Sequence, residues 1–271
     1  MMNKTYLQRH ITFPQSNPIL VDVYQIPQQQ HTVIILPALG VAIQKYEKLI
    51  QHLLEQGLNV VAADYPGCGR NTPQVSATFD FGYADLLGYF MPQLVQIAKE
   101  LSSQSPVLLG HSLGGHLATL YAQHHWIKVI GIATGNIGLT HWNMKGKINI
   151  LKAAAIFNSM ILKDGYLAGH KVGFGQKEAK TLIRDWSKVI FTGNYRHILA
   201  EETLSENEAL FIQFIGDDFA PMSSTLGLSH YFKNPHILQL DLSQTLKGNQ
   251  HSVWLKQPEE VVNIIKQFIS S

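Results

Sequence analysis

The chain has 271 residues, a formal net charge of +2, 45% hydrophobic residues and 15% charged residues. These values exclude a disordered chain, and no Lys/Arg cluster marks a nucleic-acid-binding protein. The single cysteine, Cys68, excludes an intrachain disulfide framework and a multi-cysteine metal site. No apolar run reaches the roughly 18 residues of a membrane span, and no apolar secretory signal is visible near residue 1. We therefore expect a cytoplasmic protein.

Strands and helices alternate along the first half of the sequence. The extended segments 7–13 and 19–26 predict an N-terminal antiparallel hairpin. Buried parallel strands read as continuous apolar runs. Such runs are "TVIILPALG" (32–40), "NVVAADYPG" (59–67), "PVLLG" (106–110) and "VIGIAT" (129–134), and helical patterns cover 43–56, 82–101 and 112–125. The alternation predicts an α/β fold with a mostly parallel sheet and helices on both faces.

The alternation is interrupted at about 136–205. This stretch is helical or irregular and is too long for a simple connection, so we interpret it as a cap inserted into a single domain of residues 1–271. The strand and helix pattern then resumes. Strands are expected at "ALFIQFIG" (209–216) and "HILQLDL" (236–242), and helices near 223–233 and 258–269.

The segment "PVLLGHSLGG" (106–115) places Ser112 between a strand and a helix. This is the context that the G-x-S-x-G nucleophile elbow requires. A sharp turn must hold the serine in a strained conformation, and side chains at Gly110 and Gly114 would collide with neighbouring backbone. The following helix directs its free N–H groups toward the site, which favours an oxyanion. The alternative is a glycine-rich turn with an incidental serine.

A nucleophilic serine needs a base, and the base needs an orienting acid. In this architecture the chain order is serine, then acid, then histidine. Asp217 and Asp218 directly follow a strand, and His251 lies in the loop after the next strand. All these positions fall at carboxyl ends of strands, where active sites of open α/β sheets gather. His111 adjoins Ser112, but adjacent residues point apart, so we expect it to pack into the sheet or elbow.

These motifs resemble those of the α/β-hydrolases. The chain is similar in particular to bacterial predicted α/β-hydrolases of the serine aminopeptidase/lysophospholipase-like type. The stretches that carry the resemblance are "PALGV" (37–41), "DYPGCGRN" (64–71), "GHSLGG" (110–115), "RDW" (184–186) and "GDDFAP" (216–221). The resemblance spans roughly residues 30–265. It implies a serine hydrolase for esters or thioesters without a metal, and it names no substrate.

The resemblance also separates the two aspartates. In α/β-hydrolases the acid generally lies four residues before a proline, and Asp217 has this spacing from Pro221. Asp218 remains the alternative. The oxyanion hole needs two N–H donors, of which one is expected at Leu113, the residue after the nucleophile. Because Pro37 has no N–H, the other is expected at Leu39, with Ala38 as the alternative.

The predicted function is acyl transfer to Ser112 with His251 as general base and Asp217 as its orienting acid. The apolar composition of the cap favours an apolar acyl ester or thioester as the small-molecule substrate. No His/Asp/Glu group has zinc-ligand spacing, so no metal or other cofactor is expected. An acyltransferase with the same three residues and a non-catalytic binding protein of the same fold remain as alternatives.

Overall fold

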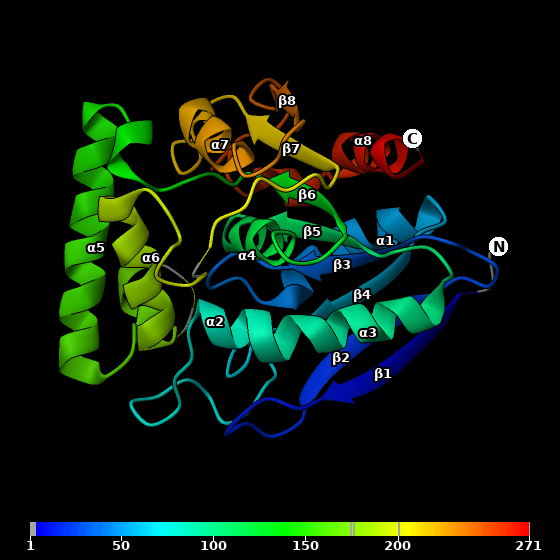
Figure 1. The fold of residues 1–271 in the computed structure, drawn as a ribbon, viewed down its shortest axis with the longest axis horizontal. Coiled ribbons are helices and arrows are strands. Elements are labelled where there is room, and N and C mark those ends of the chain that lie inside the picture. Colours follow the sequence, from blue (N-terminus) through cyan, green and yellow to red (C-terminus); the bar gives the residue numbers. More distant parts are fainter. Residues whose placement is uncertain (1–3, 174, 176, 200, 271) are drawn as a thin grey trace.

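The computed structural model describes residues 4–173, 175, 177–199 and 201–270. These residues form one sheet of eight strands in the order β1-β2-β4-β3-β5-β6-β7-β8 (Figure 1). The strands are β1 (Thr5–Ile11), β2 (Ile19–Gln25), β3 (Thr32–Leu36), β4 (Asn59–Ala63), β5 (Val107–His111), β6 (Lys128–Ile132), β7 (Ala209–Phe214) and β8 (His236–Leu240).

The N-terminal hairpin predicted from the sequence is confirmed. β1 pairs antiparallel with β2, and β2 pairs antiparallel with β4. Every pair from β4 to β8 is parallel. The carboxyl ends of these parallel strands therefore lie along one edge of the sheet, where the loops after β5, β7 and β8 meet.

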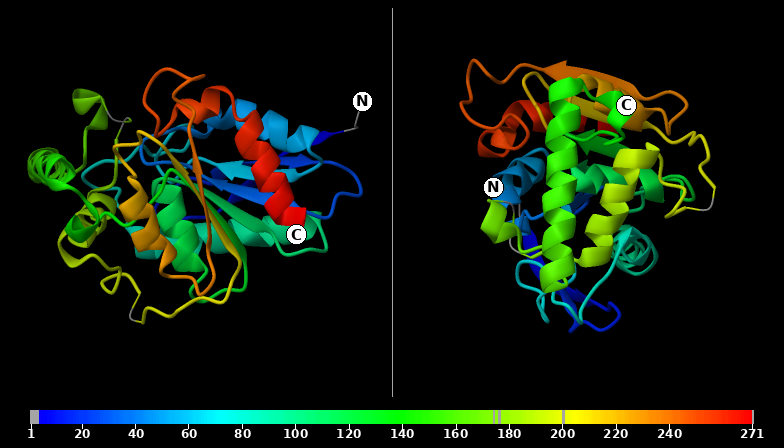
Figure 2. Two further views of the ribbon diagram at one scale, coloured as in Figure 1. Left: turned by 90° about the horizontal axis from the view of Figure 1, so that it is seen from above. Right: turned by 90° about the vertical axis from the view of Figure 1, so that its left-hand side faces the viewer.

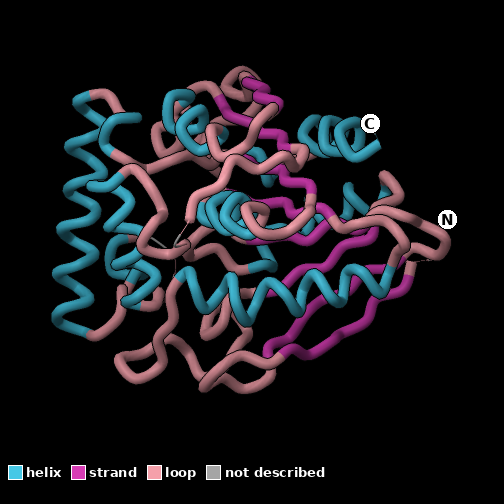
Figure 3. The backbone as a smooth tube through the Cα atoms, viewed as in Figure 1, coloured by secondary structure: helices cyan, strands magenta, loops and turns pink. Residues whose placement is uncertain are grey.

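Helices cover both faces of the sheet, as the alternation of strands and helices predicts (Figure 3). Successive residues of a strand point to opposite faces. The helices around the sheet are α1 (Glu47–Glu55), α3 (Met91–Leu101), α4 (Leu113–Tyr121), α7 (Met222–Ser229) and α8 (Glu259–Ser270). Val33 and Ile35 of β3 belong to the core under α1 and α8, whereas Ile34 and Leu36 belong to the core under α3 and α4.

The long helix expected at 82–101 is divided into three parts. A short α2 (Tyr83–Asp85) leads into a π-helical turn (Leu86–Phe90), and α3 follows. Pro92 lies at the start of α3 and has no N–H to donate to the preceding turn. The widened turn before it accommodates the missing hydrogen bond. The helix expected at 43–56 likewise begins with a 3-10 turn, Ile43–Tyr46, before α1.

Residues 136–205 connect the carboxyl end of β6 to β7, and we call them the α5–α6 segment. It contains α5 (Met144–Asp164) and α6 (Lys180–Thr192), which stand together at one end of the molecule (Figures 1 and 2). Three short 3-10 turns complete the described elements, two in this segment and one after β8. They are Leu139–His141, Gly169–Val172 and Val253–Lys256.

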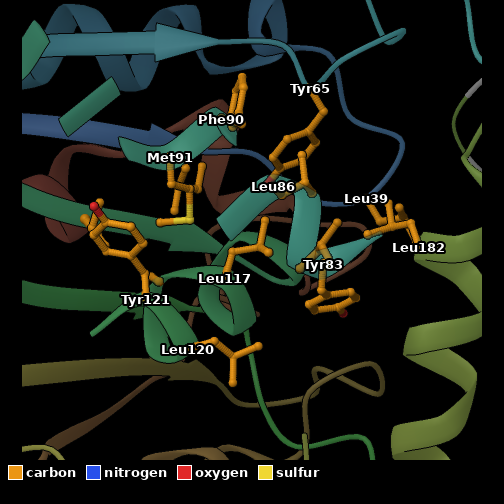
Figure 4. Close-up of a cluster of buried hydrophobic side chains, with 14 of the residues drawn as sticks. Leu39, Tyr65, Tyr83, Leu86, Phe90, Met91, Leu117, Leu120, Tyr121 and Leu182 are labelled. Carbon is orange, nitrogen blue, oxygen red and sulfur yellow. The ribbon is translucent and has the colours of Figure 1, made fainter. Parts of the chain in front are cut away.

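The α5–α6 segment shares the core of the sheet. Leu182 of α6 belongs to the same buried cluster as Leu39 and the residues of α3 and α4 (Figure 4). Polar contacts add to this packing, since the Thr181 N–H and hydroxyl donate to the Asp80 carboxylate at 2.9 and 2.6 Å. None of the helices in the described ranges combines the length and the apolar character needed to cross a lipid bilayer.

Candidate functional site

Ser112 occupies a sharp turn between β5 and α4. Its backbone has φ +53° and ψ −112°, a conformation that costs a non-glycine residue energy. Neighbouring backbone holds the turn in place. The Ser112 N–H donates to the Ile132 carbonyl at 3.0 Å, and the Thr134 hydroxyl donates to the Ser112 carbonyl at 2.7 Å. β6 therefore fixes the strained turn.

The glycines around Ser112 are required by close packing. A Cβ atom at Gly114 would lie 2.0 Å from the Leu36 carbonyl oxygen, and one at Gly110 would lie 2.2 Å from the Gly114 carbonyl oxygen. At Gly115 it would lie 2.5 Å from the Thr134 side chain. The elbow thus packs directly against the end of β3. This is the crowding that the sequence motif predicts.

Asp217 and His251 are brought together from two different loops. The His251 Nδ1–H donates to the Asp217 carboxylate at 2.9 and 3.1 Å. The Asp217 carboxylate also accepts the N–H groups of Phe219 and Ala220 at 2.8 and 3.1 Å. Its side chain has no exposed surface, whereas His251 keeps 15% of its side chain exposed. A proton on Nδ1 leaves Nε2 of His251 free to accept one.

His251 contacts His111, the residue before Ser112, and therefore lies beside the elbow. The rings of His111 and His251 have centroids 5.3 Å apart, and His111 Nε2 lies 2.8 Å from the His251 carbonyl. No hydrogen bond joins the side chains of Ser112 and His251, both of which the structure describes. In ligand-free enzymes such bonds are often long and tighten when substrate binds.

A series of buried hydrogen bonds runs through Tyr46 and His111, and no sequence motif indicates it. The Ala38 N–H donates to the Tyr46 hydroxyl at 2.8 Å, and that hydroxyl lies 2.8 Å from His111 Nδ1. A carbonyl only accepts, so the His111 proton is on Nε2, and the Tyr46 O–H donates to Nδ1. Burial lowers the pKa of His111 to about 3, which keeps the ring neutral. These hydrogen bonds join the loop after β3 to the loop that carries His251.

Two backbone N–H groups beside the elbow have no acceptor among the residues that the structure describes. Among the described residues, neither the Leu39 nor the Leu113 N–H donates a hydrogen bond to another group. The Ala38 N–H is already bonded to Tyr46. Of the two donors considered from the sequence for the loop after β3, Leu39 is therefore the free one.

Replacement of Tyr46 by phenylalanine is expected to lower kcat about 10-fold and to leave KM within about twofold. The ring keeps its packing, but the Ala38 N–H and His111 Nδ1 lose their partner, which costs roughly 1–3 kcal/mol of stability. Steady-state kinetics and denaturant unfolding measure both effects. Tyr83→Phe is the matched control, because the Tyr83 hydroxyl makes the same type of bond to His116 at 3.1 Å and bonds neither Ala38 nor His111. An equal loss of kcat in both variants would contradict this expectation.

A cavity of about 440 Å³ lies next to Ala38 and Gly40, and Ser252, which follows His251, also lines it. Ser112 and His251 do not line it. Its wall includes Glu178, a side chain buried to 1% exposure with no cationic partner in the described part of the chain. The Cys68 thiol is its neighbour, with Sγ 4.0 Å from the carboxylate. Burial raises the pKa of Glu178 to about 8.

Glu178 is expected to make the protein less stable as the pH rises. Between pH 4.5 and 8 the unfolded chain loses the Glu178 proton while the folded chain keeps it. The contribution of Glu178 to the free energy of unfolding should then fall by about 1.4 kcal/mol per pH unit. His111 and His116 have lowered pKa values and contribute in the opposite direction near pH 6.5, so the Glu178 contribution is read from the difference between wild type and a Glu178 variant.

The measurement is denaturant unfolding of wild type and Glu178→Gln between pH 6.5 and 8. The free energy of unfolding of the variant minus that of wild type should rise by about 2 kcal/mol across the window, since only wild type carries the Glu178 contribution. Glu206→Gln, at an exposed side chain paired with Lys233, is the control and should keep the wild-type slope. A difference between wild type and Glu178→Gln that stays constant across the window would disprove the expectation.

Asp218, the histidines on and just after α4, and Trp142 take no part in this arrangement. Asp218 is exposed. His124 and His125 are exposed at the end of α4, whereas His116 is buried, with Nε2 2.8 Å from the Gly135 carbonyl. Trp142 is buried and belongs to the core cluster around α5. No cluster of three or more His, Cys, Asp or Glu side chains that could hold a metal ion occurs within the described ranges.

The "DYPGCGRN" stretch holds neighbouring segments together. Asp64 accepts the Ile43 N–H at 2.7 Å and the Arg70 N–H at 3.3 Å. The Asn71 amide donates to the carbonyls of Asp64 and Tyr65, and its oxygen accepts the Leu20 N–H. Asn71 thus ties this loop to β2, a role that the sequence alone did not indicate.

Comparisons with known proteins agree with the architecture. Residues 31–161 match the family model described as the alpha/beta hydrolase fold. A search of curated protein sequences found no match to this chain. The structure resembles the α/β hydrolase GrgF from Penicillium sp. sh18, with 16% identity, a TM-score of 0.65 and 98% of each chain covered.

Two further solved structures show the same likeness. One is a carboxylesterase of the thaumarchaeon Nitrososphaera gargenis, with 17% identity, a TM-score of 0.62 and 98% of each chain covered. The other is epoxide hydrolase A from Mycobacterium thermoresistibile, with 15% identity, a TM-score of 0.62, and 98% of this chain and 99% of that one covered. At these identities the likeness concerns the fold and not the reaction. The chain has the α/β-hydrolase fold.

Proposed function

We propose that this protein is a serine hydrolase that cleaves a carboxylic ester or thioester through an acyl-enzyme on Ser112. The single observation that carries the proposal is the Asp217–His251 hydrogen bond, with Nδ1 2.9 Å from the carboxylate, beside a serine held at positive φ. A buried carboxylate bonded to a histidine, next to a strained serine that opens a helix, suits nucleophilic catalysis.

In the proposed mechanism, Nε2 of His251 removes the proton from Ser112 as Oγ attacks the carbonyl carbon. The buried Asp217 keeps the other ring proton on Nδ1 and stabilises the imidazolium that forms. The Leu39 and Leu113 N–H groups donate to the oxyanion. The imidazolium then protonates the leaving group, and water activated by the same histidine releases the acid.

The proposed substrate class rests on the apolar side chains of the α5–α6 segment. The α5–α6 segment, which we propose as the cap of a single domain, presents Phe157 and Trp186 with ring centroids 6.0 Å apart. Trp142 and Ile150 belong to the same apolar core region. Small-molecule sites combine apolar walls with a few polar groups, so an apolar acyl group is the proposed substrate portion. The 440 Å³ cavity beside Ala38 is the proposed space for the remainder of the substrate.

A fluorophosphonate probe and a graded series of p-nitrophenyl esters, from acetate to palmitate, test the proposal on the wild-type protein. We expect the probe mass on the peptide that contains Ser112 and a turnover optimum at one acyl length. Labelling of a different residue, or no labelling and no turnover, would overturn it. Products measured with added alcohol or amine separate hydrolysis from acyl transfer, because only an acyltransferase forms the new ester or amide.

A further inference from the structure

The outer face of α5 is apolar although no helix, strand or loop of the described residues covers it. The helix has 21 residues and is therefore about 30 Å long. It runs across the face turned toward the viewer in the right panel of Figure 2, with no other element in front of it. Leu162 is 79% exposed and Met144 is 71% exposed. Ile148 and Leu151 are also exposed large hydrophobic residues.

These exposed residues form one stripe that is separate from the buried face of the helix. Residues three, four or seven apart lie on the same side of an α-helix. Positions 144, 148, 151, 155 and 162 follow this spacing and are all exposed. The residues that pack into the core are a second stripe, Ile150, Ala154, Phe157 and Ile161. Since the core contacts of α5 are complete without it, the outer stripe does not stabilise the fold.

A row of lysines flanks the outer stripe. Lys145, Lys152 and Lys163 each directly follow a residue of the stripe, so each is displaced from it by about 100° around the helix. All three are exposed, and none forms an ion pair with any residue that the structure describes. The single acidic residue of α5, Asp164, is at its last position and pairs with Lys171. The face therefore combines apolar side chains with uncompensated positive charge.

We propose that the outer face of α5 docks on an anionic lipid surface. An interfacial helix buries its apolar stripe at the boundary between headgroups and acyl chains, while lysines beside the stripe contact lipid phosphates. The helix lies flat on the bilayer and does not cross it. A second copy of this chain is a poorer partner, because a facing α5 offers another row of lysines and no acidic row to pair with them.

The proposal goes beyond the proposed function and does not depend on it. It assigns a binding partner to the α5–α6 segment even if Ser112 proves unreactive. If both proposals hold, the apolar acyl substrate and the protein share the same lipid surface. The test below therefore measures lipid binding and requires no turnover.

The experiment is co-sedimentation of the full chain with vesicles of phosphatidylcholine alone or of phosphatidylcholine with about one third phosphatidylglycerol. Wild type is expected to sediment with the anionic vesicles, to remain in solution with the neutral ones, and to lose binding at high salt. Each of Lys145→Gln, Lys152→Gln and Lys163→Gln should lower the partition coefficient about fivefold. Leu162→Ser should lower it about 10-fold or more.

Trp126→Ser is the matched control, because Trp126 is 77% exposed but lies outside the α5–α6 segment. It should bind anionic vesicles like wild type. All these side chains are exposed, so the variants should keep the wild-type melting temperature. Three results would overturn the proposal: no sedimentation with anionic vesicles, sedimentation that the α5 variants leave unchanged, or a lipid-free dimer that Leu162→Ser converts to monomer.

Discussion

Replacement of Ser112 by alanine is expected to reduce p-nitrophenyl ester turnover at least about 10⁴-fold. The change removes the hydroxyl that would form the acyl-enzyme, and the remaining groups only stabilise an oxyanion formed by attack of water. Alanine is no bulkier than serine, so the strained turn at φ +53° and its bonds to Ile132 and Thr134 should persist. Steady-state kinetics measure the loss, and near-UV circular dichroism checks the fold.

Ser159→Ala is the control for this experiment, because Ser159 is an exposed serine on α5. It should retain wild-type turnover and wild-type fluorophosphonate labelling, whereas Ser112→Ala should lose both. Turnover retained in Ser112→Ala would rule out Ser112 as the nucleophile. A protein that is labelled at Ser112 but turns over no ester would instead point to a substrate outside the simple acyl esters.

Replacement of Asp217 by asparagine is expected to lower kcat about 10⁴-fold with little change in KM. The asparagine amide has the size of the carboxylate, but its N–H₂ group cannot accept the His251 proton as a carboxylate does. The imidazole then favours the wrong tautomer, and its protonated form loses the negative charge that stabilises it. The Phe219 and Ala220 N–H groups can still donate to the amide oxygen, so the loop after β7 should keep its shape.

Asp218→Asn is the matched control, because the two aspartates are adjacent and only Asp217 contacts His251. The Asp218 variant should retain turnover within about twofold. A large loss in Asp218→Asn and none in Asp217→Asn would transfer the orienting role to the neighbouring residue. Similar losses in both would indicate damage to the loop, which a drop in the melting temperature would reveal.

Much of the scaffold could be predicted because its signals are local. The runs of β-branched residues predict the strands. Gly110 and Gly114, two residues before and after Ser112, predict a sharp turn that leaves no room for a side chain at either position. The spacing to Pro221 favoured Asp217 over Asp218, and the structure bonds Asp217 to His251. The strand and helix pattern was confirmed in type, with shifts of a few residues at the element ends, where patterns are weakest.

The remaining features depend on contacts between residues that are distant in the sequence. Tyr46 and His111 are 65 positions apart, and nothing in the sequence near either residue indicates that their side chains form a hydrogen bond. Glu178 belongs to a residue type that is usually exposed, and only its contacts in the folded chain bury it. The outer stripe of α5 was hidden for a related reason. The helix is apolar on two sides, and the sequence does not say which side faces the core.

The order of the proposed catalytic residues along the chain has a consequence for folding. The elbow is complete once β5 and β6 pair, but the residue bonded to His251 follows β7, and His251 itself follows β8, the strand at the far edge of the sheet. A chain in which only the first six strands have paired presents a strained serine without an acid or a base. During synthesis or refolding, Ser112 would thus become reactive only after the last strand has docked. Partly folded molecules that lack this strand pairing would not react with a serine-directed probe.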